Sequence, residues 1–156
     1  MRIVSVSENH KIEKRIAITP DIAKKYIALG LKVSLPDNYG EHLGFKDNEY
    51  KELGVETLKN EADVLNSADI IVQLGLLSDN NLLLLKENQT LVGVLNPQIN
   101  KEKLENLSKK NINIFSLEML PRITRAQSMD ILSSQANLSG YKAVIESFAN
   151  FEKAIP

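Results

Sequence analysis

The stretch Arg2-Ile3-Val4-Ser5-Val6 at the amino terminus is typical of a buried strand. Thr19-Pro20 then predicts the start of a helix over residues 21–29, because a Thr side chain caps first-turn amides and Pro fits the first helical positions. Gly30 is typical of a helix end, and Lys32-Val33-Ser34-Leu35 predicts the next strand. This order of strand, helix and strand predicts an α/β fold.

The two kinds of segment keep alternating after residue 35. Strands are expected at residues 55–58, 69–74, 90–95 and 112–117, and helices at residues 48–53, 62–66, 80–87 and 101–110. Strands that alternate with helices at this spacing predict an open, mostly parallel sheet with helices on both faces. We therefore expect a three-layer, Rossmann-like α/β domain. A long last helix is expected over residues 125–151, leading to Ala154-Ile155-Pro156.

The composition of the chain limits its partners. Its 156 residues are enough for one domain with a substantial core, and too few for a two-domain dehydrogenase. The 19 basic and 20 acidic residues give a net charge of −1, so no overall positive field is available to bind nucleic acid. The absence of cysteine excludes disulfides, thiolate metal sites and cysteine nucleophiles.

The apolar runs in the sequence are short. The amino terminus reaches charged residues before it develops the apolar core of a secretory signal, which favours a cytosolic protein. The most hydrophobic runs, residues 70–77 and 82–85, are far shorter than the roughly 20 residues that a transmembrane helix needs. No membrane-spanning segment is expected in this chain.

A second informative stretch, Pro121-Arg122-Ile123-Thr124-Arg125-Ala126-Gln127-Ser128-Met129-Asp130, lies between the last expected strand and the last expected helix. Thr124 and Gln127 fit a capping box, a common device at helix starts that requires no functional role. Asp130 in a first turn is also favoured by the helix dipole alone. A purely structural interpretation of this stretch therefore has about even weight on spacing alone.

A functional interpretation of the same stretch is the alternative. Arg122 lies between a strand and a helix, where α/β proteins place groups that contact ligands. Gln127, Asp130 and Ser134 are expected on one face of the helix, with Ser133 beside them. Such a patch offers a cation, an amide, a carboxylate and hydroxyl groups to one ligand.

Continued as far as Val144, this stretch closely resembles the corresponding segment of the NAD(P) transhydrogenase alpha subunit, in the alanine dehydrogenase/transhydrogenase superfamily. The resemblance is strong from Met119 onward and weaker through the middle of the chain. It implies direct hydride transfer between NAD(H) and NADP(H), coupled to proton translocation, with NADP(H) on a partner component and no metal or flavin. It also implies that Arg122, Gln127 and Asp130 contact the nicotinamide end of the nucleotide and serve as catalytic residues, with Ser133 as a neighbouring hydroxyl.

The loop Glu13-Lys14-Arg15-Ile16-Ala17-Ile18-Thr19-Pro20 is by composition a solvated charged loop that leads into a helix. Arg15 matches the arginine of the R-[IV]-A-x-T-P motif of the same superfamily. In its alanine dehydrogenases that arginine binds the substrate carboxylate by the fork geometry of guanidinium. Transhydrogenases have no such substrate, so the role of Arg15 stays open.

Two departures argue against alanine dehydrogenation. The K-V-K-E-P pattern of alanine dehydrogenases, whose second lysine binds the keto acid, is replaced here by Gln73-Leu74-Gly75-Leu76-Leu77. Their catalytic histidine is replaced by Asn96, which has no proton to exchange near neutral pH. The two histidines of the chain, His10 and His42, lie in polar loops and are expected to be solvated.

The sequence also has no G-x-G-x-x-G turn to hold a pyrophosphate. We therefore expect residues 1–156 to be an N-terminal domain that ends before the NAD-binding Rossmann domain. The resemblance then implies further partners: the missing Rossmann domain or chain, a second copy in a homodimer, and membrane and NADP-binding components. The expected location is the cytoplasm, peripheral to the membrane through those partners.

Two other functions stay open. The first is a non-catalytic assembly module that docks a partner along small residues spaced by multiples of four in the last helix, at Ser128, Ala136 and Gly140. The second is a diverged amino-acid dehydrogenase, which the missing lysine and histidine make the weakest interpretation.

Overall fold

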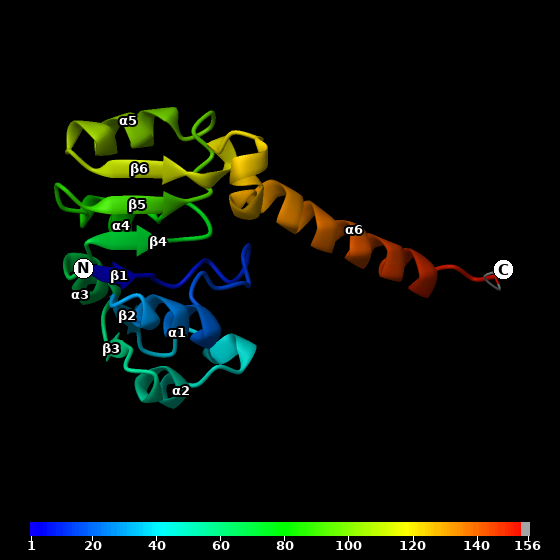
Figure 1. The fold of residues 1–156 in the computed structure, drawn as a ribbon, viewed down its shortest axis with the longest axis horizontal. Coiled ribbons are helices and arrows are strands. Elements are labelled where there is room, and N and C mark those ends of the chain that lie inside the picture. The colour runs from blue at the N-terminus through cyan, green and yellow to red at the C-terminus, as the bar shows by residue number, and fades with distance from the viewer. Residues whose placement is uncertain (154–156) are drawn as a thin grey trace. The chain divides into compact units, whose positions relative to one another are not determined.

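The computed structural model describes residues 1–153, and Ala154-Ile155-Pro156 lie outside the described residues. The chain divides into two compact units, Met1–Ser116 and Leu117–Pro156. We describe each unit by itself. The first holds the sheet, and the second holds the long last helix (Figure 1).

The first unit is built on one parallel sheet of six strands in the order β3-β2-β1-β4-β5-β6, which lie side by side in Figure 1. All five strand pairs are parallel. The strands are β1 (Arg2–Val4), β2 (Lys32–Pro36), β3 (Glu56–Leu58), β4 (Ile70–Val72), β5 (Thr90–Gly93) and β6 (Asn113–Ser116). This order is that of a doubly wound fold, with a switch point between β1 and β4. The predicted Rossmann-like, parallel α/β architecture is confirmed.

Five α-helices and a short 3-10 helix, η1 (Glu41–Leu43), connect the strands. The α-helices are α1 (Pro20–Ala28), α2 (Asp47–Glu52), α3 (Glu61–Asn66), α4 (Asp79–Leu83) and α5 (Lys101–Lys109). As predicted, Thr19 caps α1 by accepting a hydrogen bond from the amide of Ile22, and Pro20 occupies its first turn. Gly30 follows the helix with a φ of 80°, the left-handed region that glycine adopts without strain. Local chemistry therefore sets both ends of α1.

Two hydrophobic cores lie on opposite faces of the sheet. One core joins the alternate residues Ile3 and Val33 of β1 and β2 to Ala23 of α1 and Tyr50 of α2. The other joins the remaining strand positions to α3, α4 and α5, through residues such as Leu65, Leu82 and Leu104. Alternation of side chains along each strand explains why neighbouring residues belong to different cores. No helix among the described residues is long and apolar enough to cross a membrane.

The second unit corrects the predicted start of the last helix. The structure has a 3-10 helix η2 (Leu117–Met119), a second one, η3 (Thr124–Met129), and then α6 (Ile131–Ala149), so the helix begins at Ile131 and not near Arg125. Ile123, not Thr124, occupies the N-cap position of η3, so the predicted capping box does not form the start of a helix. Asp130 is the N-cap of α6 and is not inside its first turn. Ser128 consequently lies outside the stripe of small residues expected on that helix.

Candidate functional site

A cavity of about 300 Å³ lies in the second unit, entirely between Pro121 and Ser133. Its lining includes all four residues singled out from the sequence, Arg122, Gln127, Asp130 and Ser133. The backbone brings these groups together because η3 folds back before α6 begins. A guanidinium, an amide, a carboxylate and a hydroxyl group therefore border one small space.

Asp130 organises one side of this cavity. Its Oδ1 accepts hydrogen bonds from the backbone amides of Leu132 and Ser133 at 3.0 and 3.2 Å, which is the N-cap geometry. Its Oδ2 accepts a third hydrogen bond from the hydroxyl of Ser133 at 2.6 Å. Ser133 is thus held by its hydroxyl as well as its amide, and its position depends directly on Asp130.

The charge of Asp130 is stabilised where it lies. The hydrogen bond from the Ser133 hydroxyl holds the pKa of this carboxyl below its usual value, with help from backbone amides and the positive charge of Arg122. Asp130 therefore remains an anion at neutral pH. It is an acceptor and a fixed negative charge, and it is not a source of protons.

The predicted helical face of Gln127, Asp130 and Ser134 does not form, because the three residues belong to two different helices. Ser134 instead donates from its hydroxyl to the backbone oxygen of Asp130 at 2.9 Å. Gln127 reaches the cavity from η3, and Ser133 reaches it from the first turn of α6. The predicted group of side chains is present, with a different backbone beneath it.

A second cavity, of about 370 Å³, lies in the first unit at the carboxyl ends of β1, β4 and β5. It is lined by Arg15, Gly75 and Asn96, the three positions that the comparison with alanine dehydrogenases singled out. Glu8 and Glu13 line it as well. The switch point of a doubly wound sheet is where ligands commonly bind, so this cavity is the other candidate site.

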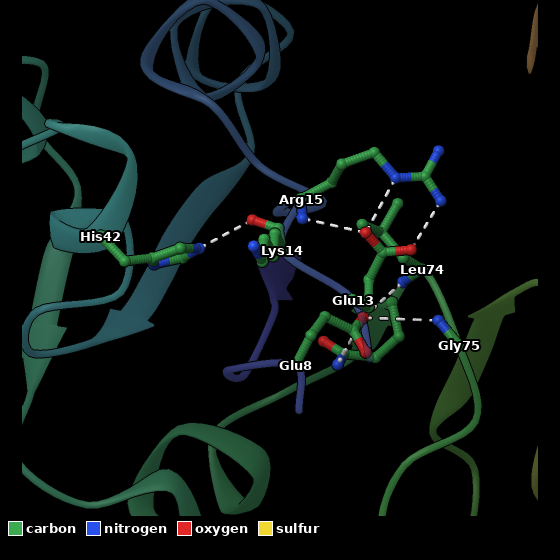
Figure 2. Close-up of polar contacts among 8 residues, drawn as sticks. Glu8, Glu13, Lys14, Arg15, His42, Leu74 and Gly75 are labelled. Carbon is green, nitrogen blue, oxygen red and sulfur yellow. Dashed lines mark hydrogen bonds and ion pairs between the residues drawn. The ribbon is translucent and has the colours of Figure 1, made fainter. Parts of the chain in front are cut away.

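Arg15 is already paired with a carboxylate in this cavity. Its Nε and Nη2 donate to the two carboxylate oxygens of Glu13 at 2.9 and 2.6 Å, in a side-on fork that Figure 2 shows. The guanidinium beside it lowers the pKa of Glu13, and Glu13 in turn raises the pKa of Arg15. The fork geometry that would receive a substrate carboxylate is therefore turned towards an internal one.

Glu8 occupies the backbone donors at the end of β4. Its Oε1 accepts from the amides of Leu74 and Gly75 at 2.7 and 3.3 Å (Figure 2). The side-chain amide of Gln73 donates to the same oxygen at 3.2 Å. Sequence analysis did not identify Glu8, because its partners lie more than sixty residues away and no local pattern marks them.

A buried polar network supports this end of the sheet from below. The Tyr39 hydroxyl donates to Ser5 Oγ at 2.8 Å and accepts from the amides of Ala17 and Ile18 at 3.1 and 3.3 Å. Ser5 donates in turn to Gln73 Oε1 at 2.7 Å. Burial raises the pKa of Tyr39 to about 12. The network therefore fixes the loop of Arg15 to the ends of β1 and β4.

The two histidines are not isolated in solvent as predicted. The rings of His10 and His42 stack with centroids 3.8 Å apart. Nε2 of His42 also lies 2.7 Å from the backbone oxygen of Lys14, the residue before Arg15 (Figure 2). The pair therefore joins η1 to the loop that carries Arg15. Among the described residues no cluster of three or more metal-binding side chains occurs.

The fold and these two cavities define an α/β protein of the doubly wound, dinucleotide-enzyme class. Residues 5–139 match the family model described as alanine dehydrogenase/PNT, N-terminal domain. The chain belongs to this family.

The curated relatives include several transhydrogenase subunits. The chain is 41% identical to the first of the alpha chains of NAD(P) transhydrogenase from Rickettsia prowazekii, over all of its own length and 42% of that relative. It is 35% identical to the protein of the same name from Rhodospirillum rubrum, again over 42% of the relative. Identity to alanine dehydrogenase 1 of Staphylococcus aureus is 24% over 93% of the chain. The chain thus spans less than half the length of these relatives.

Solved structures agree with this relationship. A transhydrogenase from Sinorhizobium meliloti superposes with a TM-score of 0.88 over 99% of this chain and 46% of that one, at 32% identity. An L-alanine dehydrogenase superposes with a TM-score of 0.70 over 76% of the chain at 21% identity, which shows the shared fold. The predicted resemblance to the N-terminal region of a transhydrogenase alpha subunit is confirmed.

Proposed function

We propose that this chain is the N-terminal domain of a proton-translocating NAD(P) transhydrogenase subunit, in which hydride passes between NAD(H) and NADP(H). One observation carries the proposal: Arg122, Gln127, Asp130 and Ser133 line one cavity in a chain that is 41% identical to a transhydrogenase alpha subunit. The whole activity requires the remainder of the subunit, since the chain spans 42% of that relative.

The groups in the cavity of the second unit fit the nicotinamide end of a dinucleotide. When bound, the nicotinamide supplies the hydride, and no metal or flavin takes part in such a direct transfer. The Gln127 amide has both a donor and an acceptor, which match the carboxamide on the ring or the adjoining ribose. Arg122 anchors the anionic part of the nucleotide, and the fixed negative charge of Asp130 sets the polarity beside the ring.

Asp130 has a second task in this account. Because its carboxylate accepts from two backbone amides and the Ser133 hydroxyl, it also fixes the start of α6 and the position of Ser133. The contribution of these residues is orientation of the ring and exclusion of water. In our proposal Arg122, Gln127 and Asp130 are the catalytic residues, and Ser133 completes the cofactor contact.

The pyrophosphate must be bound elsewhere, because the sequence lacks the glycine-rich turn that would hold it. We assign that role to a Rossmann domain in the remainder of the subunit. NADP(H) then belongs to a partner component, a membrane component carries the proton, and the subunit acts as a homodimer at the cytoplasmic face. Amino-acid dehydrogenation is disfavoured, since Gly75 and Asn96 offer the second cavity neither an ammonium nor an acid-base group.

The test is single-turnover hydride transfer in a complete subunit, made by joining residues 1–156 to the remainder of the Rickettsia prowazekii relative, with its NADP-binding partner. Gln127→Asn and Asp130→Asn should slow transfer by about 10–1,000-fold while NADH affinity changes less than about threefold. The smaller change in affinity is expected because most of the binding energy comes from the distant pyrophosphate.

Glu102→Gln is the matched control, because it removes a carboxylate from the exposed surface of α5, outside both cavities. It should leave both quantities unchanged. Normal transfer rates in both cavity variants would remove these residues from the reaction. Transhydrogenation by residues 1–156 alone would contradict the need for the remainder of the subunit.

A further inference from the structure

One half of one sheet face has no helix over it within residues 1–116. The register places Val72 of β4 beside Val92 of β5, and Val92 beside Phe115 of β6. The same face carries a second row, formed by Ile70, Thr90 and Asn113. We call these six residues the open face; they are Ile70, Val72, Thr90, Val92, Asn113 and Phe115.

The order of the connections explains why this face is open. Helices α1 and α2 connect β1, β2 and β3, and both belong to the core on the same side as Ile3. The chain then passes from β3 to β4 across the sheet, and α3, α4 and α5 all belong to the core on the opposite side. The side that holds α1 and α2 therefore has no helix of the first unit above β4, β5 and β6.

Burial differs sharply between the two sides of these strands. Ile71 and Leu91, which face α3, α4 and α5, are both 0% exposed. On the open face Phe115 is 59% exposed, and Val72 and Val92 are only partly buried. Parallel sheets are normally covered on both faces, because their strands are apolar on both sides. An exposed phenylalanine at the end of such a row marks a surface that needs a cover.

The open face is continuous with a completed core. Ile70 and Val72 pack against the core that lies beneath α1, so the apolar surface runs from that core outward to Phe115. None of its six residues is charged. Three strands span about 10 Å between the axes of the outer two, which is close to the 10–12 Å diameter of one helix with side chains. One further helix, lying beside α1, is enough to cover this surface.

We propose that the open face is the docking surface for an amphipathic helix from the remainder of the same subunit. The length of the relatives supports this occupant, because this chain covers 42% of the Rickettsia prowazekii subunit and 46% of the Sinorhizobium meliloti chain. The chemistry of the surface supports a helix with a stripe of aliphatic side chains over Val72, Val92 and Phe115. Its polar groups belong over Thr90 and Asn113. The proposal rests on the family and not on hydride transfer.

The absence of cysteine from the sequence makes a direct test possible. Phe115→Cys places a single thiol on the open face, and Leu83→Cys places one on α4 as the matched control, since Leu83 is 73% exposed and α4 belongs to the opposite face. The alkylation rate of each thiol is measured in residues 1–156 and in the same chain joined to the remainder of the Rickettsia prowazekii relative, with the relative's own cysteines replaced by serine.

The expected result is slower alkylation of Phe115→Cys in the joined chain by at least about tenfold, with less than about a twofold change for Leu83→Cys. An equal rate at position 115 in a joined chain that unfolds cooperatively would overturn the proposal. Protection that appears in residues 1–156 alone and rises with concentration would also overturn it, in favour of a second copy on the open face.

A second arm keeps the test decisive if the joined chain does not fold. The same two cysteine substitutions are made at the aligned positions of the complete Rickettsia prowazekii subunit. Protection at the position aligned with Phe115, and not at the one aligned with Leu83, supports the proposal. Equal alkylation rates at both positions would refute it. Neither arm measures transhydrogenation, so the result is independent of the proposed activity.

Discussion

Tyr39→Phe tests whether the buried network at the switch point holds the first unit together. The side chain is 1% exposed, and its hydroxyl makes three hydrogen bonds, to Ser5 Oγ and from the amides of Ala17 and Ile18. The substitution keeps the ring and removes only the oxygen. It leaves two buried or partly buried amides and a buried serine without this partner.

The expected loss in the free energy of unfolding is about 1–3 kcal/mol, the usual cost of leaving a buried polar group unsatisfied. For a chain of this size each kcal/mol lowers the melting temperature by about 2–4 °C. The measurement is urea and thermal unfolding of residues 1–156 at pH 8, followed by circular dichroism. Tyr141→Phe is the control, because that tyrosine is 69% exposed.

The same variant makes a prediction for alkaline pH. Burial raises the pKa of Tyr39 to about 12, so the folded protein keeps the phenol proton at a pH where the unfolded chain, with a tyrosine pKa of about 10, loses it. Stability from this group is therefore complete below about pH 10 and is lost as the pH rises to about 12. At 1.4 kcal/mol per pKa unit the loss is about 3 kcal/mol.

Tyr39→Phe should lose less stability than the parent chain between pH 9 and pH 11, because it has no phenol to ionise at this position. Tyr50, whose pKa burial also raises, is present in both proteins and does not affect the comparison. An unfolding free energy at pH 8 equal to that of the parent, together with an equal alkaline decline, would refute the assignment of Tyr39 as the centre of the network.

Three further predictions concern the two cavities and the sheet. Gly93→Ala should destabilise the chain by about 1–3 kcal/mol in urea unfolding, because a Cβ there would lie 2.6 Å from the backbone oxygen of Gln73; an unchanged midpoint would contradict this close packing. Glu13→Gln should reduce the loss of stability on acidification, since the lowered pKa of Glu13 stabilises the fold above its unfolded value of about 4.5 and this contribution disappears as the pH falls through the folded value; equal urea midpoints of variant and parent at both pH 7 and pH 3 would argue against the pairing with Arg15. Gly75→Lys combined with Asn96→His should create weak pyruvate binding in saturation-transfer NMR where the parent has none, because both positions line the 370 Å³ cavity beside Arg15 and a Cβ at Gly75 has its nearest contact at 3.8 Å; no signal in the folded double variant would show that the internal carboxylates keep this cavity closed.

The periodic elements were predictable from the sequence because their signals are local. Ile70 to Val72 and Thr90 to Gly93 are short apolar runs bounded by polar residues, and both form interior strands. The start of the last helix was predicted wrongly, because two local patterns compete there. Thr124 and Gln127 fit a capping box, whereas Asp130 forms the actual cap six residues after Thr124. A sequence pattern does not reveal which of two adequate caps the packed chain uses.

The two cavities differed in the same respect. Arg122 and Ser133 are eleven positions apart, so a single segment brings them together, and their grouping was predictable. The contacts of Glu8 with Leu74 and of Ser5 with Gln73 join strands that are distant in sequence, and only the sheet order places them together. Their sequence signal was limited to polar residues at the ends of apolar runs.

The most direct test of the proposed function is to locate the nicotinamide ring on the protein. A dinucleotide with a photoreactive diazirine on the nicotinamide ring is bound to the complete subunit, and the crosslinked residues are identified by peptide mass spectrometry. Our account predicts crosslinks within residues 121–133, which line the cavity of Arg122, Gln127 and Asp130. Crosslinks confined to the cavity of Arg15, Gly75 and Asn96 would contradict it.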